Sequence, residues 1–292
     1  MKSVSQFFMS KQLKDKRRLS KSKIIRWLVV SNYMQQINRN NLSSSSWSPD
    51  GSVLATGSND KTVKLTRVAG HETESLETTL TMHEATVRDC TWLAEGQILV
   101  TAGAGDDQIF LTDCTTGEVT QTRAGHAGHA MCVYSWAASQ VFVSGGQDGA
   151  VVFWDRRTSE SVGRVGGEED SEVSCVNSVC VDPTGRLLVT GHQDGSCRLH
   201  DIRGRRGLQT LGHHEGEVRS VRLSPPATHL LSAGYDGRLV LTDLQGDITQ
   251  ERQTVTVGRH EDKVVNARWD PGDCSFITCS ADKTAVIWSL SD

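Results

Sequence analysis

Short runs of alternating apolar and polar residues, joined by turns, make up most of this chain after residue 37. One example is Val141–Ser144, followed by the turn Gln147–Gly149 and a second apolar run, Val151–Trp154. Asp-Gly between two apolar runs favours a hairpin turn, and alternation with a period of two indicates half-buried strands. The same pattern recurs around Asp194-Gly195 and Asp236-Gly237, whereas helical periodicity is nearly absent. The pattern therefore predicts an all-β chain built from hairpins.

The hairpin turns recur at a nearly constant interval. Their aspartates follow one another at alternating intervals of 46 and 42 residues, at Asp60, Asp106, Asp148, Asp194, Asp236 and Asp282. A self-similar unit of this length is typical of a β-propeller, in which each repeat forms one blade and cannot bury its face alone. We place the repeats at about 38–68, 83–119, 126–160, 172–206, 214–248 and 260–292, within one domain over 37–292. Six blades could close a ring, or could be the remainder of a seven-blade ring.

Other polar residues stand at fixed distances from each aspartate. Four positions before it the repeats hold, in chain order, Thr56, Ala102, Ser144, Thr190, Ser232 and Thr278. Histidines lie 22 or 23 positions upstream of four aspartates, at His83, His126, His214 and His260. Six positions downstream the repeats hold Thr66, Thr112, Trp154, His200, Thr242 and Trp288. In this spacing of His, Ser or Thr, Asp and Trp the chain resembles the WD40-repeat family.

The resemblance implies that these residues form one hydrogen-bonded structural set in each blade. A buried carboxylate costs several kcal/mol unless donors satisfy it. Two repeats carry the whole set: His126, Ser144, Asp148 and Trp154, and then His260, Thr278, Asp282 and Trp288. The others are incomplete, with Asn38 and Glu172 at two histidine positions and Ala102 at a hydroxyl position, so we expect their blades to be less stable. Because a catalytic triad occurs once rather than in every blade, we expect no enzymatic activity and no small-molecule substrate.

The first 36 residues differ from the rest of the chain. Residues 1–27 carry nine Lys or Arg against Asp15 alone, which leaves residues 28–292 with a net charge of −12 out of the total of −4. The apolar segment 24–30 has the length and β-branched composition of a strand, and we expect it to pair with the last blade. The competing interpretation is a basic lead that adds no strand. The segment is too short to span a bilayer.

The eight cysteines are scattered, with no Cys-x-x-Cys and no paired histidines at ligand spacing. We therefore expect neither a zinc site nor a disulfide framework, and no cofactor. Glycine-rich stretches such as 102–105 lack the Lys-Ser/Thr ending of a phosphate-binding loop. Cysteines that behave as small apolar residues suit a reducing cytoplasm.

By resemblance, WD40 proteins bind other proteins on the face formed by the turns before each first strand and around each aspartate. The candidate partner-binding residues on that face are Arg88, Asn177 and Arg219 near the first strands, and Asn59, Gln147, Gln193 and Tyr235 just before the aspartates. Tyrosine and arginine are the residue types most enriched at interface hot spots. The pattern thus favours a protein-interaction scaffold.

Similarity in several short stretches narrows the resemblance to one group of WD40 proteins. The stretches 55–64, 102–106, 112–114 and 242–249 are similar to the C-terminal propellers of the nemitin family of WD40 proteins. This resemblance implies a cytoplasmic scaffold associated with microtubules, with tubulin or microtubule-associated proteins as partners. Two alternatives stay open: a substrate-recruiting subunit of a ubiquitin ligase, and a nucleic-acid-associated propeller. The acidic body argues against the second, because phosphate binding needs clustered Lys and Arg on the folded surface.

Overall fold

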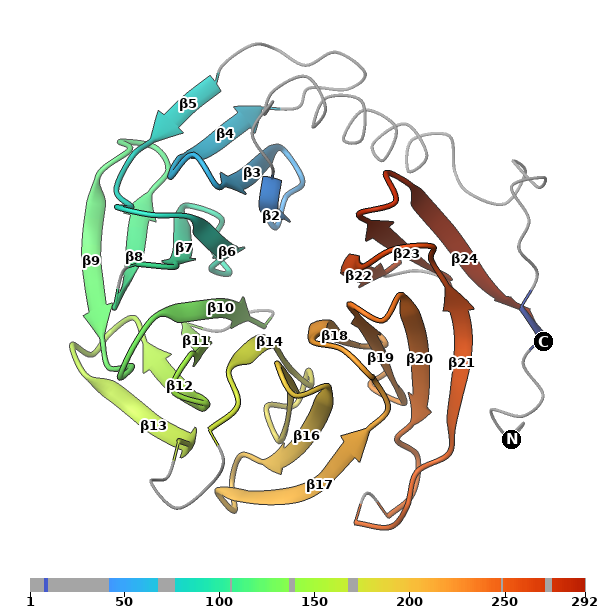
Figure 1. Ribbon diagram of the computed structural model, residues 1–292. Coiled ribbons are helices and arrows are strands. Elements are labelled where there is room, and N and C mark those ends of the chain that lie inside the picture. Colours follow the sequence, from blue (N-terminus) through green and yellow to red (C-terminus); the bar gives the residue numbers. More distant parts are fainter. Residues whose placement is uncertain are drawn as a thin grey trace. The chain divides into compact units, whose positions relative to one another are not determined.

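The computed structural model describes residues 8–9, 42–67, 77–105, 107–136, 140–167, 173–247, 249–270 and 275–291. Within these residues the secondary structure consists of strands and turns, arranged as six four-stranded antiparallel sheets (Figure 1). The predicted all-β fold with six propeller blades is therefore confirmed. The chain divides into two compact units, one of Arg17–Val173 and one of Met1–Lys16 with Ser174–Asp292, each holding three blades.

The N-terminal unit, Arg17–Val173, contains blades 1 to 3, in each of which neighbouring strands follow one another along the chain. Blade 1 consists of β2 (Leu42–Trp47), β3 (Val53–Ser58), β4 (Val63–Arg67) and β5 (Glu77–Leu80). Blade 2 consists of β6 (Val87–Trp92), β7 (Ile98–Gly103), β8 (Gln108–Asp113) and β9 (Val119–Ala124). Blade 3 consists of β10 (Ala130–Ser135), β11 (Val141–Gly146), β12 (Ala150–Asp155) and β13 (Ser161–Gly166).

The C-terminal unit contains blades 4 to 6. Blade 4 consists of β14 (Val176–Val181), β15 (Leu187–His192), β16 (Ser196–Asp201) and β17 (Arg206–Gly212). Blade 5 consists of β18 (Val218–Leu223), β19 (His229–Gly234), β20 (Arg238–Asp243) and β21 (Thr254–Arg259). Blade 6 consists of β22 (Val264–Trp269), β23 (Ser275–Ser280), β24 (Ala285–Ser291) and β1 (Phe8–Met9).

The outermost strand of blade 6 comes from the start of the chain. Phe8 pairs with Ser291 and Met9 with Leu290 in antiparallel register. A contribution from the N-terminal segment was expected here, but at 24–30, and those residues lie outside the described part of the chain. The strand that the structure pairs with β24 is thus an earlier one, two residues long.

The innermost strands carry a β-bulge at one shared position. The register shifts between the first and third residues of β6, β14 and β18, among others, so that Arg88, Asn177 and Arg219 each occupy the bulge. A bulge bends its strand and re-aims a side chain. The sequence places candidate partner-binding residues at these positions, and the backbone gives all three the same local setting.

The residue after the bulge joins successive blades inside each unit. Asp89 Oδ2 accepts a hydrogen bond from the Val133 amide at 3.2 Å, Ser178 Oγ accepts one from Val221 at 3.1 Å, and Ser220 Oγ one from Ala267 at 3.2 Å. Each donor belongs to the innermost strand of the next blade. These bonds satisfy amides that the bulges and blade junctions would otherwise leave unpaired.

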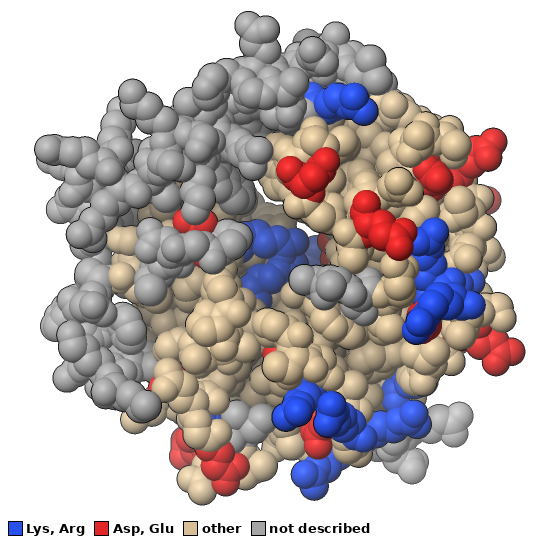
Figure 2. Space-filling model, turned by 180° about the vertical axis from the view of Figure 1, so that it is seen from behind, with Lys and Arg blue, Asp and Glu red and all other residues tan. Residues whose placement is uncertain are grey.

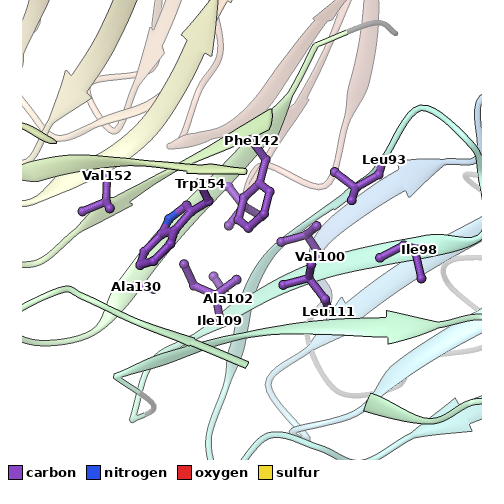
Figure 3. Close-up of a cluster of buried hydrophobic side chains, with 11 residues drawn as sticks. Leu93, Ile98, Val100, Ala102, Ile109, Leu111, Ala130, Phe142, Val152 and Trp154 are labelled. Carbon is purple, nitrogen blue, oxygen red and sulfur yellow. The ribbon is translucent and has the colours of Figure 1, made fainter. Parts of the chain in front are cut away.

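Apolar side chains fill the space between blades 2 and 3. The cluster contains Phe142 and Trp154 of blade 3, both almost fully buried, and it extends to Val100, Ile109 and Leu111 of blade 2 (Figure 3). The ring centroids of Phe142 and Trp154 lie 6.3 Å apart with the planes nearly parallel. Since the tryptophan ring covers the neighbouring blade while its indole nitrogen stays in its own blade, one side chain serves both packing and hydrogen bonding.

Replacing Ser220 tests the inter-blade bond. The Ser220→Ala variant leaves the buried Ala267 amide without its acceptor, and we expect a loss of about 1–3 kcal/mol in the free energy of unfolding, measured with urea. Ser161→Ala, on an exposed position of β13, should change it by less than about 0.5 kcal/mol. Equal effects of the two variants would show that the bond contributes nothing.

Candidate functional site

Blade 3 holds a complete histidine, hydroxyl, aspartate and tryptophan set. His126 Nδ1 lies 3.0 Å from Asp148 Oδ1, and His126 Nε2 lies 2.7 Å from Ser144 Oγ, which also accepts a hydrogen bond from Trp154 Nε1 at 2.8 Å. A carboxylate only accepts, so Nδ1 donates to Asp148. The two bonds hold the imidazole ring in one orientation.

The carboxylate of Asp148 gathers further donors. It accepts hydrogen bonds from the Ala127 amide at 2.9 Å and from Arg164 Nη2 at 2.8 Å. Burial by itself raises the pKa of Asp148, but the bonds from His126 and Ala127 outweigh it, and the pKa lies well below its usual range. Blade 6 repeats the set, with His260 Nδ1 2.9 Å from Asp282 Oδ2 and both His260 Nε2 and Trp288 Nε1 bonded to Thr278 Oγ1.

These sets have the atom order of a hydrolytic triad without its accessibility. Ser144 and Thr278 are fully buried, and each hydroxyl oxygen already receives an indole N–H. A nucleophile needs space for the reacting carbonyl beside it. Burial and repetition in two blades indicate that the sets hold the turns in place. Among the described residues, no three His, Cys, Asp or Glu side chains lie close enough to hold a metal ion.

Where threonine stands at the tryptophan position, the set is incomplete in the same way each time. The hydroxyls of Thr66, Thr112 and Thr242 are buried, and none has a hydrogen-bond partner among the described residues. In blade 5, His214 still bridges Asp236 at 3.0 Å and Ser232 at 2.9 Å. Threonine is too short to reach the hydroxyl on the neighbouring strand. Without the indole, the third strands of blades 1, 2 and 5 each carry one buried hydroxyl without a hydrogen-bond partner among the described residues.

The structure of blade 2 shows that the sequence alignment of this repeat was shifted by one residue at the hydroxyl position. His83 Nε2 bonds to Thr101 Oγ1 at 2.8 Å, so the hydroxyl of the set is Thr101, and the assignment of this position to Ala102 was wrong. The turn is one residue longer here, with Gly105 at φ 103°. The histidine of this repeat precedes Asp106 by 23 residues instead of 22, which was the signal of the insertion. Asp106 itself lies outside the described residues.

Blade 4 forms its set with a different histidine. His192 Nε2 lies 2.8 Å from Thr190 Oγ1, and His192 Nδ1 lies 3.0 Å from the Ser174 carbonyl oxygen. Glycine stands at the same register position in blades 3 and 5, where a Cβ on Gly146 would lie 2.3 Å from His126 Nδ1. The ring of His192 thus occupies the place that the upstream histidine fills elsewhere.

The buried histidines of blade 4 are hard to protonate. Burial lowers the pKa of His192 from 6.5 to about 4, and the positive charge of Arg198 adds to the effect. Burial is also the larger cause, and the positive charge of Arg198 the smaller one, that lowers the pKa of His200 to about 4. His200 stands at the tryptophan position, with Nε2 3.4 Å from Thr190 Oγ1. Asp194 takes no part in the set and is bonded to Ser196 and Arg198 instead.

Asp60 is likewise bonded to its own turn, accepting from the Thr62 amide at 3.0 Å and hydroxyl at 2.6 Å. The hydroxyl of Thr56 lies 3.5 Å from the Lys64 carbonyl. The candidate histidine substitutes Asn38 and Glu172 lie outside the described residues. The bonds of Asp60 to Thr62 thus hold the hairpin turn of blade 1 locally.

The two groups of candidate partner-binding residues lie at the same end of their blades. The amide of the residue before the aspartate donates to a carbonyl just ahead of the first strand: Gln147 to His129 at 2.9 Å, Gln193 to Cys175 at 3.0 Å and Tyr235 to Glu217 at 2.9 Å. Asn59, Gln147 and Gln193 are exposed, Arg88, Arg219 and Tyr235 half-buried, and Asn177 buried. The main-chain bonds therefore place the predicted residues along one end of each unit.

In the C-terminal unit three of these residues meet in one cluster. Arg219 Cζ lies 5.5 Å from the centroid of the Tyr235 ring, and Lys263 Nζ lies 4.7 Å from it. Asn177 Nδ2 lies 3.5 Å from Glu217 Oε2, which links blade 4 to blade 5. A cation over a tyrosine ring is held by the ring quadrupole, at about 0.5–2 kcal/mol. We call Asn177, Glu217, Arg219, Tyr235 and Lys263 the tyrosine cluster.

Sequence reasoning missed Lys263 and Glu217. Both stand three residues after the histidine of their repeats, His260 and His214, in the loop whose carbonyl bonds to the residue before the aspartate. Both residues lie two positions before the bulge of their innermost strands, so a sequence analysis that included this position would have found them. The N-terminal unit has candidate residues at the same positions as Arg219 and Tyr235, but on separate blades: Arg88 at the bulge of blade 2, and Asn59 and Gln147 before the aspartates of blades 1 and 3. Arg88 Nε has no hydrogen-bond partner among the described residues.

Comparison with known proteins agrees with this geometry. A family model described as "Nucleolar protein 10-like, N-terminal domain", a β-propeller model, matches residues 32–246, and the model of the WD domain, G-beta repeat, matches residues 251–289. The chain belongs to the WD40-repeat β-propeller family.

Several WD40 relatives are components of larger assemblies by name. The chain is 29% identical over 228 residues to a guanine nucleotide-binding protein subunit beta of Oryza sativa subsp. indica, covering 73% of this chain and 58% of the relative. It is 25% identical over 153 residues to target of rapamycin complex subunit LST8 of Mus musculus, covering 51% and 46%. The chain thus spans about half the length of the curated relatives it matches.

A solved structure confirms the WD40 fold. A chain in the crystal structure of the mitotic checkpoint complex superposes with a TM-score of 0.73 at 22% identity, covering 86% of this chain and 75% of that one. Two of the relatives are subunits of larger assemblies by name, which agrees in general terms with a protein-interaction role. No helix among the described residues is long and apolar enough to cross a membrane.

The buried threonine hydroxyls without partners lead to a prediction about the stability of the protein. Thr242→Val removes a buried hydroxyl that has no partner, so we expect the free energy of unfolding to stay constant or rise by about 1 kcal/mol. Ser144→Ala strands both His126 and Trp154 Nε1 and should lower it by about 2–3 kcal/mol. Urea denaturation compares the two, and destabilisation by Thr242→Val would mean that the hydroxyl is satisfied after all.

The histidines of blade 4 predict a pH dependence. The unfolded chain protonates His192 near pH 6.5 and the folded chain near pH 4, so the unfolded state binds more protons between these values and stability rises with pH. Acidification from pH 7 to pH 5 should cost about 2 kcal/mol through His192. In urea titrations the His192→Asn variant should lose the share of the pH dependence that His192 contributes and keep that of His200, whereas a variant of the more exposed His129 (His129→Gln) should keep both.

Proposed function

We propose that this WD40 protein is a non-catalytic scaffold that holds an acidic segment of a partner protein on the tyrosine cluster. The observation that carries the proposal is that two cations lie close to the ring of Tyr235, with Arg219 Cζ 5.5 Å and Lys263 Nζ 4.7 Å from its centroid. Tyrosine brings a large contact area at low entropic cost, and arginine brings directional hydrogen bonds, as at interface hot spots. Both cations remain available for a carboxylate, since neither has a salt bridge to a described residue.

The names of two relatives support a scaffold, since they denote a subunit of a guanine nucleotide-binding protein and a subunit of the target of rapamycin complex. Catalysis finds no support in the sets of blades 3 and 6, whose hydroxyls are buried and already bonded. We therefore infer that binding, rather than chemistry, is what the chain contributes to its assemblies.

The finer proposal concerns the partner and the place. We propose association with microtubules in the cytoplasm, through tubulin or a microtubule-associated protein. It rests on the resemblance of stretches such as 55–64 and 242–249 to nemitin-family propellers and on the fit of a cationic, aromatic cluster to the acidic surface of tubulin. A substrate-recruiting role in a ubiquitin ligase would use the same cluster but needs a ligase partner.

Cosedimentation with taxol-stabilised microtubules tests the proposal. The Arg219→Gln/Lys263→Gln variant of the full chain should lose at least tenfold in affinity, because two charges that face the acidic partner are gone. The matched control is Arg203→Gln/Arg205→Gln, which removes two exposed charges from the turn between β16 and β17. Folding of each variant is checked by its thermal midpoint.

Two results would reject the microtubule proposal. One is that the unsubstituted chain does not pellet, and the other is that both double variants lose affinity equally. In either case the scaffold proposal is tested separately, by comparing the proteins that the unsubstituted chain and Arg219→Gln/Lys263→Gln capture from cell extract. Identical sets of captured proteins would show that the tyrosine cluster is not the binding surface.

A further inference from the structure

Four arginines gather at the end of blade 4 that lies opposite Asp194. Arg186 lies in the turn between β14 and β15, and Arg203, Arg205 and Arg206 lie in or next to the turn between β16 and β17. Antiparallel connections bring these two turns to the same end of the sheet. The Ile202 amide donates to the Arg186 carbonyl at 2.9 Å, which joins the turns directly. We call these four residues the arginine patch.

The guanidinium groups of the arginine patch are largely without partners. All four residues are exposed, and Arg186, Arg203 and Arg205 have no side-chain hydrogen bond or ion pair with any described residue. Arg206 Nε lies 3.7 Å from Asp201 Oδ2, and its side chain is 72% exposed. The other nearby carboxylate, Asp182, is buried and bonded to the Thr184 hydroxyl and to the amides of Arg186 and Leu187.

The corresponding turn of blade 3 shows what neutralised arginines look like. Arg157 forms a fork with Asp155, its Nη2 lying 2.6 Å from Oδ2, and Arg156 Nη1 lies 3.0 Å from Glu95 Oε2. Those two guanidinium groups are used within the protein. In blade 4 the same turn carries more arginine and less carboxylate, so positive charge remains for a ligand.

The backbone of the turn presents the arginines in a fixed way. Asp201 Oδ1 accepts the Arg203 amide at 3.1 Å, and a Cβ on Gly204 would lie 2.6 Å from Asp201 Oδ2, so a larger residue there would displace the carboxylate that holds the turn. Arg205 takes φ 49°, the left-handed region that non-glycine residues adopt only with strain. Arg203 and Arg205 therefore extend from a constrained turn rather than from a loose loop.

We propose that the arginine patch binds a phosphorylated serine or threonine in an extended segment of a protein partner. A phosphate dianion offers three strong acceptor oxygens, which match the planar forks of two or three guanidinium groups better than a single carboxylate does. Recognition of phosphorylated motifs by arginine clusters is an established binding mode of proteins. The site is independent of the tyrosine cluster, which lies at the other end of its blades.

A short phosphorylated segment fits better than a nucleic acid. The patch spans one end of one blade, and neither turn contains an aromatic residue on which a base could stack. The net charge of −12 over residues 28–292 disfavours a long polyanion that would run beyond the patch. Figure 2 shows basic side chains at several places on the drawn face, with acidic side chains among and beside them, rather than one continuous basic surface.

The test uses the immobilised full chain and a degenerate library of ten-residue peptides with a central phosphoserine. The unmodified library and one with glutamate at the centre are run in parallel, and retained peptides are quantified by mass spectrometry. We expect the phosphorylated library to be enriched at least tenfold over both others. Enrichment should fall to background with Arg203→Gln/Arg205→Gln and should decrease with Arg186→Gln.

Matched controls separate this site from general charge effects. Arg156→Gln/Arg157→Gln removes the same charges from the paired turn of blade 3, and Arg219→Gln/Lys263→Gln removes them from the tyrosine cluster; both should retain the enrichment. Equal retention of the three libraries, or equal loss with all double variants, would overturn the proposal. Tighter anisotropy-detected binding of a twenty-nucleotide poly(U) RNA than of the retained phosphopeptides would overturn it in favour of nucleic acid.

Discussion

The buried hydroxyl on the second strand of each blade is the constraint around which the blades are built. In blade 3, Ser144 must find partners away from water, and it finds them in His126 and Trp154. The histidine then fixes the turn aspartate, and the indole brings a large ring against the neighbouring blade. One hydroxyl thereby couples a turn, two strands and an inter-blade core, because leaving any member unpaired in a low-dielectric interior costs more than a bond contributes.

The incomplete blades show that the constraint is met by whatever group can reach the hydroxyl. Blade 4 lacks a described upstream histidine, and His192 bonds to Thr190 from two residues further along the same strand, at a position where glycine stands in blades 3 and 5. The threonines at the tryptophan position leave their own hydroxyls unpaired, so the cost appears on the third strand instead. We therefore expect the blades to differ in local stability although their strands are arranged alike.

Much of this could be predicted from sequence because the repeat and its turn chemistry are local. The hairpins around Asp148, Asp194 and Asp236 follow from Asp-Gly between alternating runs. The predictions that failed depended on the exact alignment of a repeat or on contacts between blades. Thr101 was misaligned with Ala102 by a one-residue insertion in the turn, and Lys263 was missed because its contact with Tyr235 crosses from one blade to the next. The two-residue strand at Phe8 has no periodicity that a sequence pattern could reveal.

The same logic separates positions that maintain the fold from positions that can bind. A polar group that is buried and already bonded inside the protein, such as Asp148, has little left to offer a partner. The tyrosine cluster keeps two cations on one ring without a carboxylate salt bridge, and the arginine patch keeps its guanidinium groups in water. Both lie at blade ends, where turns can vary without disturbing the strand ladders. A repeated fold can thus carry binding sites in the residues that its repeating network leaves unused.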